Sequence, residues 1–254
     1  MVSETHIQKA AQFILESSST VALTGAGVST ESGIPDFRGP NGLWTKVDAS
    51  KFASVDAFLS DPKGWWLTAL ELSPTIMNAK PNPAHKILAK LEKMGLIQWL
   101  VTQNVDGLHK QAGSKNVLEV HGSLSSASCI VCRAQVGRRY LEKAIKKRWI
   151  PPTCPDCGGI LKLDAVLFGE GLPREAMAEA VNAARTCRLM LVVGSSLLVY
   201  PVATLPSIAR QSGAHLIIIN HEETPFDDVA DLVFHAEAGD ILTRITEIVK
   251  RFHR

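Results

Sequence analysis

The chain lacks several features that would place it in a large class of proteins. Only 6% of its 254 residues are aromatic, and its net charge is +2. No stretch reaches the ~18 uninterrupted apolar residues of a membrane-spanning helix, and the polar start at residues 3–6 lacks the apolar core of a secretory signal. Without concentrated positive charge the chain is poorly suited to neutralise nucleic-acid phosphates. These absences predict a cytoplasmic protein with neither a membrane nor a nucleic acid as its main partner.

Cysteine is also scarce, but four of the five cysteines form two Cys-x-x-Cys pairs. Cys129 and Cys132 make the first pair, and Cys154 and Cys157 make the second. Each pair can direct two thiolates to one metal ion, and together they complete a tetrahedron. Because four thiolates leave no open position, we predict one structural Zn²⁺ that folds a small segment; redox or coincidental cysteines are the alternative. The fifth, Cys187, is expected to be buried and inert.

Apolar strands and amphipathic helices alternate along most of the chain. Strands are predicted at residues 21–24, 97–101, 117–120, 189–193 and 216–219, and helices at 7–15, 84–94, 174–185, after 201 and at 241–252. This alternation predicts an α/β fold, a Rossmann-like parallel sheet with helices on both faces. We expect residues 1–124 and 161–254 to form this domain and residues 125–160 to form an inserted zinc-ribbon module.

Between Pro40 and Pro83 the sequence shows no regular period. Aromatic side chains are scattered there among prolines and short polar turns: Trp44, Phe52, Phe58, Trp65 and Trp66. We predict that this stretch, part of a cofactor and substrate loop region near residues 30–83, forms a mobile, aromatic-rich cover over a ligand. Ordinary packed loops are the alternative.

Residues 25–39 follow the first strand and read Gly-Ala-Gly-Val-Ser-Thr-Glu-Ser-Gly-Ile-Pro-Asp-Phe-Arg-Gly. The glycines let the backbone turn tightly and approach a ligand with no Cβ in the way, and exposed N–H groups suit the phosphates of a nucleotide. The spacing differs from the dehydrogenase pattern, because the third glycine comes at Gly33. An ordinary glycine-rich turn is the alternative. A turn alone has no use for the adjoining proline, carboxylate, aromatic ring and guanidinium.

Polar residues follow four of the predicted strands. Residues 102–107 read Thr-Gln-Asn-Val-Asp-Gly, His121 follows the next strand, and residues 194–196 and 220–221 follow two later ones. Parallel sheets bind ligands at the carboxyl ends of their strands, so we expect these residues to meet at one site. Capping loops and a structural histidine are the alternatives. A pKa of ~6.5 makes histidine the side chain best suited to accept a hydroxyl proton near pH 7.

Four segments, at residues 25–39, 102–106, 121–122 and 194–197, resemble in order the signature motifs of the sirtuins, the NAD-dependent protein deacylases. The resemblance extends from about Val21 to Asp240. It implies that NAD is consumed as a co-substrate while an acetyl group is transferred from lysine to ADP-ribose, releasing nicotinamide and O-acetyl-ADP-ribose. Mono-ADP-ribosyl transfer and long-chain deacylation at the same site are the alternatives. A non-catalytic zinc module that binds NAD as a sensor is a further one.

The resemblance also implies a role for individual residues. His121 would be the general base, Asn104 and Asp106 would line the nicotinamide pocket, and Gln103 would contact the ribose hydroxyls. Phe37 would shield the reacting ribose carbon from water, and Arg38 would hold the cofactor loop. The residues implied to contact NAD are Gly25, Ala26, Gly27, Thr30, Pro35, Asp36, Phe37, Arg38, Gln103, Asn104, Val105, Asp106, His121, Gly194, Ser195, Ser196, Asn220, His221 and Ala238.

Residues 163–170 resemble the sirtuin segment to which an acylated peptide adds as a β-strand. Val166, Phe168 and Gly169 would contact the acyl-lysine, although Leu163 stands where the family often has proline. Main-chain pairing supplies affinity without reading many side chains, so a broad choice of acetylated proteins or peptides is expected. We expect the chain to act as a monomer.

The acyl preference is predicted from an absence. Sirtuins that favour succinyl- or malonyl-lysine carry a Tyr-x-x-Arg pair after the cofactor signature, and an ungapped placement puts Ala69 and Leu72 at those positions. The resemblance therefore implies a preference for acetyl over acidic acyl groups, unless Lys63 or Lys80 supplies a substitute cation.

Overall fold

A parallel six-stranded sheet forms the centre of the computed structural model, which describes residues 3–36, 42, 45 and 48–253. Across the sheet the strands are β3 (Val117–Glu119), β2 (Trp99–Thr102), β1 (Thr20–Thr24), β7 (Leu189–Val193), β8 (His215–Ile219) and β9 (Leu232–Phe234). All neighbours pair in parallel, and Thr24 lies opposite both Thr102 and Val193. The strand order reverses between β1 and β7, which is where such sheets bind nucleotides. The predicted fold class is confirmed.

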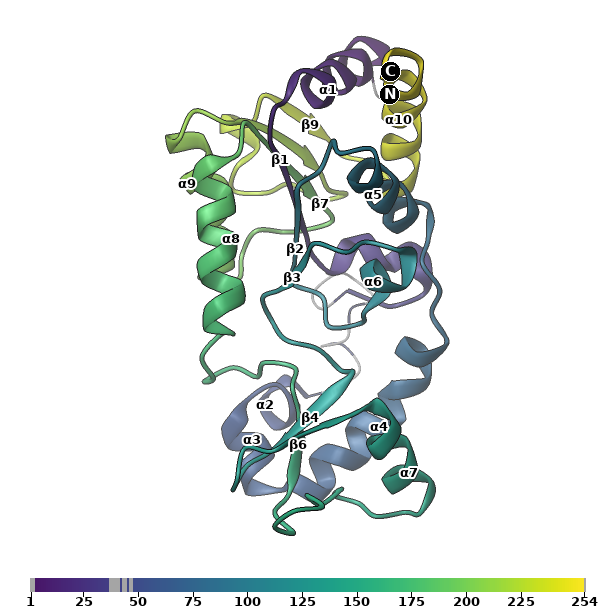
Figure 1. Cartoon of the computed structure of the whole chain (residues 1–254), viewed down its shortest axis with the longest axis vertical. Coiled ribbons are helices and arrows are strands. Elements are labelled where there is room, and N and C mark those ends of the chain that lie inside the picture. Colours follow the sequence, from purple (N-terminus) through teal and green to yellow (C-terminus); the bar gives the residue numbers. More distant parts are fainter. Residues whose placement is uncertain (1–2, 37–41, 43–44, 46–47, 254) are drawn as a thin grey trace.

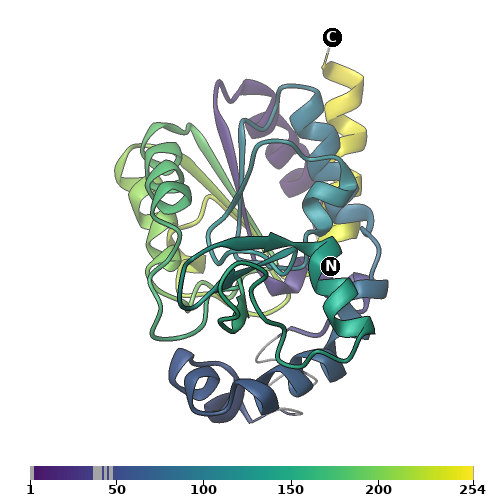
Figure 2. The same cartoon turned by 60° about the horizontal axis from the view of Figure 1, so that its bottom comes forward.

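Helices cover both faces of this sheet (Figure 2). One face carries α1 (Glu4–Glu16), α5 (Pro83–Lys93) and α10 (Ala238–Phe252), and the other carries α8 (Arg174–Thr186) and α9 (Leu205–Gln211). Successive strand residues point to opposite faces, so Ala22 packs with the first helices while Val21 and Leu23 pack with the second. Burial on both sides explains why the strands read as unbroken apolar runs.

A smaller lobe lies below the carboxyl ends of these strands (Figure 1). Its described elements are α2 (Ala49–Phe52), α3 (Val55–Ser60), α4 (Pro62–Asn78), β4 (Ser126–Cys129), β5 (Gln135–Gly137), α7 (Arg138–Lys146) and β6 (Leu161–Leu163). The strands form an antiparallel sheet in the order β5-β4-β6. Phe58, Trp65 and Trp66 share a core with this sheet, and the Trp66 indole N–H donates to the Leu161 carbonyl at 2.8 Å. The segment before α5 and the cysteine-bearing segment therefore stabilise each other.

Several elements of this fold differ from the expectation. Residues 49–78 form helices where loops were predicted, with Trp65 and Trp66 buried against the small sheet. Asp61 begins α4 by accepting a hydrogen bond from the Gly64 N–H at 2.9 Å, but Pro74 inside the helix obscures its period. Strand β9 was not predicted either.

Within the described residues, no helix has the length and apolar character needed to cross a membrane.

Candidate functional site

A cavity of about 2200 Å³ lies between the carboxyl ends of the main strands and the smaller lobe. Every described residue predicted to bind NAD or substrate lines it: Gly25, Ala26, Gly27, Thr30, Pro35, Asp36, Gln103, Asn104, Val105, Asp106, His121, Val166, Phe168, Gly169, Gly194, Ser195, Ser196, Asn220, His221 and Ala238. Phe37 and Arg38 lie outside the described residues. The fold thus brings together residues as far apart in the sequence as Gly25 and Ala238.

Two glycine loops meet backbone to backbone at one end of this cavity. Gly27 N–H donates to the Gly194 carbonyl at 2.8 Å. A Cβ on Gly194 would lie 2.1 Å from the Val28 nitrogen, and one on Gly25 would lie 2.8 Å from the Gly194 carbonyl oxygen. Gly194 also has a positive φ of 60°. Side chains are excluded from this cradle, and such a side-chain-free backbone surface fits the phosphates of a dinucleotide.

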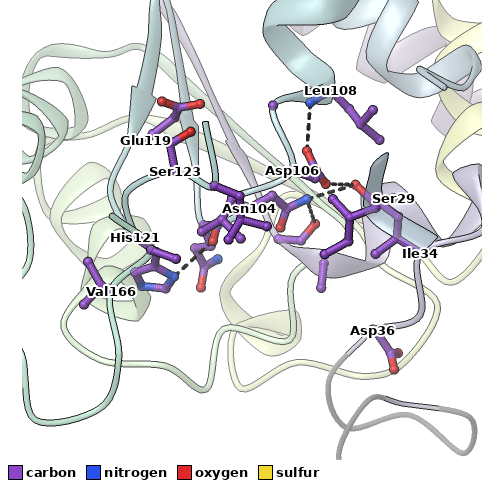
Figure 3. A pocket seen from close by; sticks show the side chains of 18 of the residues that line it. Ser29, Ile34, Asp36, Asn104, Asp106, Leu108, Glu119, His121, Ser123 and Val166 are labelled. Carbon is purple, nitrogen blue, oxygen red and sulfur yellow. Dashed lines mark hydrogen bonds between the residues drawn. The ribbon is translucent and has the colours of Figure 1, made fainter. Parts of the chain in front are cut away.

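Asn104 and Asp106 meet Ser29 at the end of β2 (Figure 3). The Ser29 hydroxyl lies 2.7 Å from Asp106 Oδ2, and the Asp106 Oδ1 atom accepts the Leu108 N–H at 2.8 Å. The Asn104 amide donates to Ser29 Oγ at 3.1 Å and to the Gly25 carbonyl at 3.0 Å. These bonds fix a carboxyl group and an amide at the cavity wall, where they can recognise a carboxamide.

Two buried histidines behind this wall were not predicted to belong to the site. His85 Nε2 lies 3.4 Å from Ser29 Oγ, and His109 Nε2 lies 2.9 Å from Thr24 Oγ1. Burial lowers the pKa of His85 to about 4 against the opposing effect of Asp106, and burial together with His85 lowers the pKa of His109 to about 3. A sequence signal for His85 did exist, because it lies three residues before Leu88 on the apolar stripe of its helix.

His121 follows β3 and lies on the cavity wall beside Val166 (Figure 3). Its Nδ1 atom lies 3.1 Å from the Gln103 carbonyl oxygen. A carbonyl only accepts hydrogen bonds, so Nδ1 carries the proton and Nε2 keeps its lone pair. Burial lowers the pKa of His121 from 6.5, which the bond to Gln103 partly opposes. The ring is therefore neutral near pH 7, with a nitrogen able to accept a proton.

Gly122 fixes the direction of the His121 turn. It has a φ of +75°, and a Cβ there would lie 1.9 Å from the Asp164 carbonyl oxygen. The Ser123 N–H donates to that same oxygen at 3.4 Å, and the Val166 N–H donates to the His121 carbonyl at 2.9 Å. The turn is thus packed against the segment that leaves the small sheet.

Residues 166–169 form the wall opposite the glycine loops. The Phe168 main chain pairs with the loop before α3, donating to Ala53 at 2.8 Å and accepting from Val55 at 3.0 Å. The Lys162 ammonium lies 3.0 Å from the Glu170 carboxylate and donates to the Leu163 and Ala165 carbonyls. These contacts hold the backbone on both sides of residues 166–169. Phe168 is 57% exposed, so its ring is available to a ligand.

The four paired cysteines gather away from the cavity. Their sulfur atoms all lie within 4.8 Å of one another, with Cys129 Sγ 3.5 Å from Cys157 Sγ and Cys132 Sγ 3.6 Å from Cys154 Sγ. Tetrahedral Zn²⁺ with bonds of about 2.3 Å requires sulfur atoms about 3.8 Å apart, so the cluster fits this ion. The Val131 N–H donates to Cys129 Sγ at 3.4 Å, which favours a thiolate there, and the Gly159 N–H donates to Cys157 Sγ at 3.4 Å. The predicted metal ligands are therefore positioned together.

The chain is similar to known proteins over almost its whole length. The sequence model of the family described as "Sir2 family" matches residues 25–201. An NAD-dependent protein deacetylase of Caldivirga maquilingensis is 46% identical over 96% of this chain and 93% of the relative. An NAD-dependent protein deacylase 2 of Archaeoglobus fulgidus is 43% identical over 98% of each.

Solved structures of Sir2 proteins are also similar to this chain over almost its whole length. A structure from work on the mechanism and regulation of Sir2 enzymes has a TM-score of 0.90 and 42% identity, covering 98% of this chain and 99% of that one. A Sir2 complex with p53 peptide and NAD⁺ has a TM-score of 0.86 and 41% identity, covering 95% and 97%.

Proposed function

The chain belongs to the Sir2 family, and from this premise we propose that it is an NAD-dependent protein lysine deacetylase. One observation carries the proposal: His121 presents an unprotonated Nε2 in a cavity bounded by the glycine cradle on one side and residues 166–169 on the other. Related structures hold the corresponding ligands, including deacetylated p53 peptide with 3′-O-acetyl-ADP-ribose. Acetylated peptides or proteins are the substrates.

The residues divide the binding of NAD between them. The backbone of Gly25, Gly27 and Gly194 would face the phosphates, and Gln103, whose amide lies 2.8 Å from Ser195 Oγ, would reach the ribose hydroxyls. Asn104 and Asp106 would hold the nicotinamide end. The other residues predicted to contact NAD also line the cavity: Ala26, Thr30, Pro35, Asp36, Val105, Ser195, Ser196, Asn220, His221 and Ala238.

When bound, NAD would supply the ribose carbon that captures the acyl oxygen as nicotinamide departs. One water would be consumed and the free lysine amine released, and the acetyl group would remain on ADP-ribose. The wall formed by Val166, Phe168 and Gly169 would orient the acyl-lysine toward that carbon. His121 Nε2 would then accept the proton of a ribose hydroxyl as this oxygen attacks the acyl carbon. The Nδ1 bond to Gln103 stabilises the ring as it gains charge. Phe37 and Arg38 keep their predicted roles of shielding the reacting carbon and holding the loop.

The cysteine cluster would hold one structural Zn²⁺ within an insert at residues 125–160. The flanking segments 1–124 and 161–254 would form the NAD-binding domain. Because none of these four cysteines forms a disulfide and the net charge is small, we further propose that the chain works in the reducing cytoplasm without a nucleic-acid partner. We also propose that it acts as a monomer.

Long-chain deacylation is a second candidate, favoured by the lining of the cavity. Ala69, Leu72 and Ile76 of α4 face the same space as Leu141 and Ile145 of α7. An apolar extension of this kind can accept an acyl group longer than acetyl.

Mass spectrometry of one acetylated peptide, incubated with and without NAD, tests the proposal. The expected result is loss of the acetyl mass only when NAD is present. A gain of ADP-ribose with the acetyl group retained would instead identify a mono-ADP-ribosyltransferase. A myristoylated copy of the peptide, assayed beside the acetylated one, tests the second candidate.

A further inference from the structure

Helix α10 begins without a cap from its own sequence. Its N-cap residue, Glu237, makes no side-chain hydrogen bond to the first turn. The first backbone N–H groups of a helix have no partner within the helix, and an N-cap side chain normally accepts one of them, two or three residues further on. In α10 the N–H at the nearer of these positions belongs to Gly239, the second residue of the helix.

The missing cap is supplied by Glu31, from the other end of the chain. The Gly239 N–H donates to Glu31 Oε1 at 2.8 Å, across 208 residues of sequence. Glu31 lies in the 3-10 helix η1 (Ala26–Ser32), which begins directly after Gly25 of the glycine cradle. A carboxylate is favoured at this place because the N-terminus of a helix carries a partial positive charge.

Gly239 is the residue that lets this carboxylate approach. The three atoms nearest to a Cβ on Gly239 would all belong to Glu31, with Oε2 at 2.4 Å. Glycine is otherwise among the least favourable residues within a helix, so the helix itself gives no reason for it. The hydrogen bond and the glycine thus indicate independently that the two segments are fitted to each other.

This contact joins two walls of the cavity from behind. Ala26 and Thr30 of η1 line the cavity beside the glycine cradle, and Ala238 lines it at the start of α10. Glu31 is not one of the described residues that line the cavity. It therefore acts on a ligand only through the segments that it holds.

The strand order indicates which part of NAD lies at the start of α10. Strands β8 and β9, the latter leading into α10, lie on one side of the cradle strands β1 and β7. Strands β2 and β3, which precede the proposed nicotinamide pocket and His121, lie on the other side. The two phosphates of NAD separate its nicotinamide riboside from its adenosine. With the phosphates on the cradle and nicotinamide beside β2, adenosine falls to the wall that includes Ala238.

We infer that Glu31 is a positioning residue for NAD: by capping α10 it holds the glycine cradle and the adenosine wall at a fixed separation. The inference rests on the proposed function. Without the carboxylate, η1 and the first turn of α10 can separate, and NAD affinity falls with the fraction of molecules that keep the binding arrangement. The nicotinamide pocket and the wall at residues 166–169 are not held by this contact, so the chemical step should be unaffected.

Calorimetric titration with ADP-ribose, which lacks nicotinamide, tests the inference. Glu31→Ala should weaken binding by about three- to tenfold, within the range expected for the loss of a helix cap. Glu31→Gln should bind nearly as well as the unaltered chain, because its amide oxygen can still accept the Gly239 N–H. Asp240→Ala is the matched control, since it removes a carboxylate of the same turn whose ion-pair partner, Arg244, lies on α10 itself. Unchanged affinity in Glu31→Ala, or an equal loss in Glu31→Gln or Asp240→Ala, would overturn the inference.

A double-mutant cycle separates this contact from general destabilisation. Gly239→Ala should displace the carboxylate and weaken ADP-ribose binding as Glu31→Ala does. Adding Gly239→Ala to Glu31→Ala should weaken binding no further, because the two changes remove the same contact. Losses that simply add would show that the two residues act separately, which would overturn the inference.

Two further measurements distinguish a failure of the inference from a failure of the proposed function. Steady-state kinetics of Glu31→Ala should show a higher KM for NAD with an unchanged kcat, and a fall in kcat alone would overturn the positioning role. Without any ligand, hydrogen exchange of the Gly239 amide should be faster in Glu31→Ala and remain slow in Asp240→Ala; an unchanged rate in Glu31→Ala would show that Glu31 does not cap α10. If ADP-ribose fails to bind the unaltered chain, the proposed function fails and the role in NAD binding with it, while the exchange rates still decide whether Glu31 is the cap.

Discussion

His121 shows how a single contact decides what a residue can do. The proton on Nδ1 is fixed by the Gln103 carbonyl, so the only lone pair of the ring is on Nε2. Burial lowers the pKa, so the base stays unprotonated at pH values somewhat below 6.5. Had Nδ1 faced a donor instead, the lone pair and the proton would be exchanged, and the nitrogen available for base catalysis would be the other one.

Replacing His121 by alanine should reduce deacetylation by about 10²–10⁴-fold, the usual value of general-base catalysis. NAD affinity should change by no more than a few-fold, because the base acts after the cofactor binds. Steady-state kinetics and calorimetry measure the two quantities separately. Near-normal turnover in this variant would contradict the assignment, as would a loss of activity explained wholly by weaker NAD binding.

The glycine cradle gives a prediction that separates two reasons for needing glycine. Gly194 and Gly213 both have positive φ, but only Gly194 has backbone atoms within 3 Å of where a Cβ would be. Gly213→Ala should therefore cost about 1 kcal/mol of unfolding free energy from the φ alone. Gly194→Ala should cost clearly more and weaken NAD binding, as measured by denaturant unfolding and calorimetry. Equal losses in the two variants would show that the close approach of the loops is unimportant.

At the scale of elements, the small sheet is connected to the base of the proposed reaction. Strand β6 continues into residues 164–166, and these hold the His121 turn through the bonds from Ser123 and Val166. The Asp164 carboxyl also bonds to Ser126 on β4 and to Gln135 on β5 at 2.7 Å. If the cysteine-bearing segment became disordered, the hydrogen bonds that hold the His121 turn would therefore be lost as well.

Removing zinc with a chelator, or replacing Cys154 by alanine, should lower both the melting temperature and the rate of deacetylation. The metal folds the insert, and the insert holds the His121 turn. Cys187→Ala is the matched control, because Cys187 is buried in the core between the large sheet and helices α8 and α9 and is not part of the four-cysteine cluster. The activity of this variant should remain sensitive to the chelator. If the metal-free chain keeps both its melting temperature and its rate of deacetylation, the prediction that the cysteine cluster has a structural role is wrong.

Helix α4 determines the expected acyl preference. Ala69 and Leu72 line the cavity, whereas Lys63 and Lys80 are not among its lining residues. A succinyl carboxylate next to these apolar side chains would lose hydration and find no cation among the residues of α4 that line the cavity. The cations that line the cavity from α7, Arg138 and Lys146, are the ones that the comparison of acyl groups tests.

We expect kcat/KM for acetyl-lysine to exceed that for succinyl-lysine by at least about tenfold, which needs only ~1.4 kcal/mol. Ala69→Tyr combined with Leu72→Arg should narrow the difference by supplying a cation. Comparable values for the two acylated forms of one peptide in the unaltered chain would show that another cation serves the cavity.

At the scale of the whole molecule, the cavity exists because two lobes meet at the carboxyl edge of one sheet. The large sheet supplies the glycine loops and the ends of β2 and β3, and the smaller lobe supplies the wall at residues 166–169 together with α4 and α7. Phe58, Trp65 and Trp66 tie α3 and α4 to the small sheet. One substrate can thus be bound on each side of His121.

Much of this arrangement follows from local signals in the sequence. Apolar runs of four or five residues predicted β1, β2, β7 and β8, and the Cys-x-x-Cys spacing predicted the metal cluster. The helices at residues 49–78 were missed because Pro74 and the clustered aromatic residues obscure a 3.6-residue period. The contacts of Ser29 with His85 and Asp106 could not be predicted from the sequence. His85 is 56 residues from Ser29 and Asp106 is 77 residues from it, and only the folded sheet brings them together.

Product stoichiometry measures the central claim, that NAD and acetyl-lysine react with each other over His121. Nicotinamide, deacetylated peptide and O-acetyl-ADP-ribose are quantified in one reaction by chromatography and mass spectrometry. The account predicts equal amounts of all three at every time point, and no deacetylated peptide when NAD is omitted. Deacetylation without NAD, or nicotinamide release that is not matched by acetyl-ADP-ribose, would contradict it.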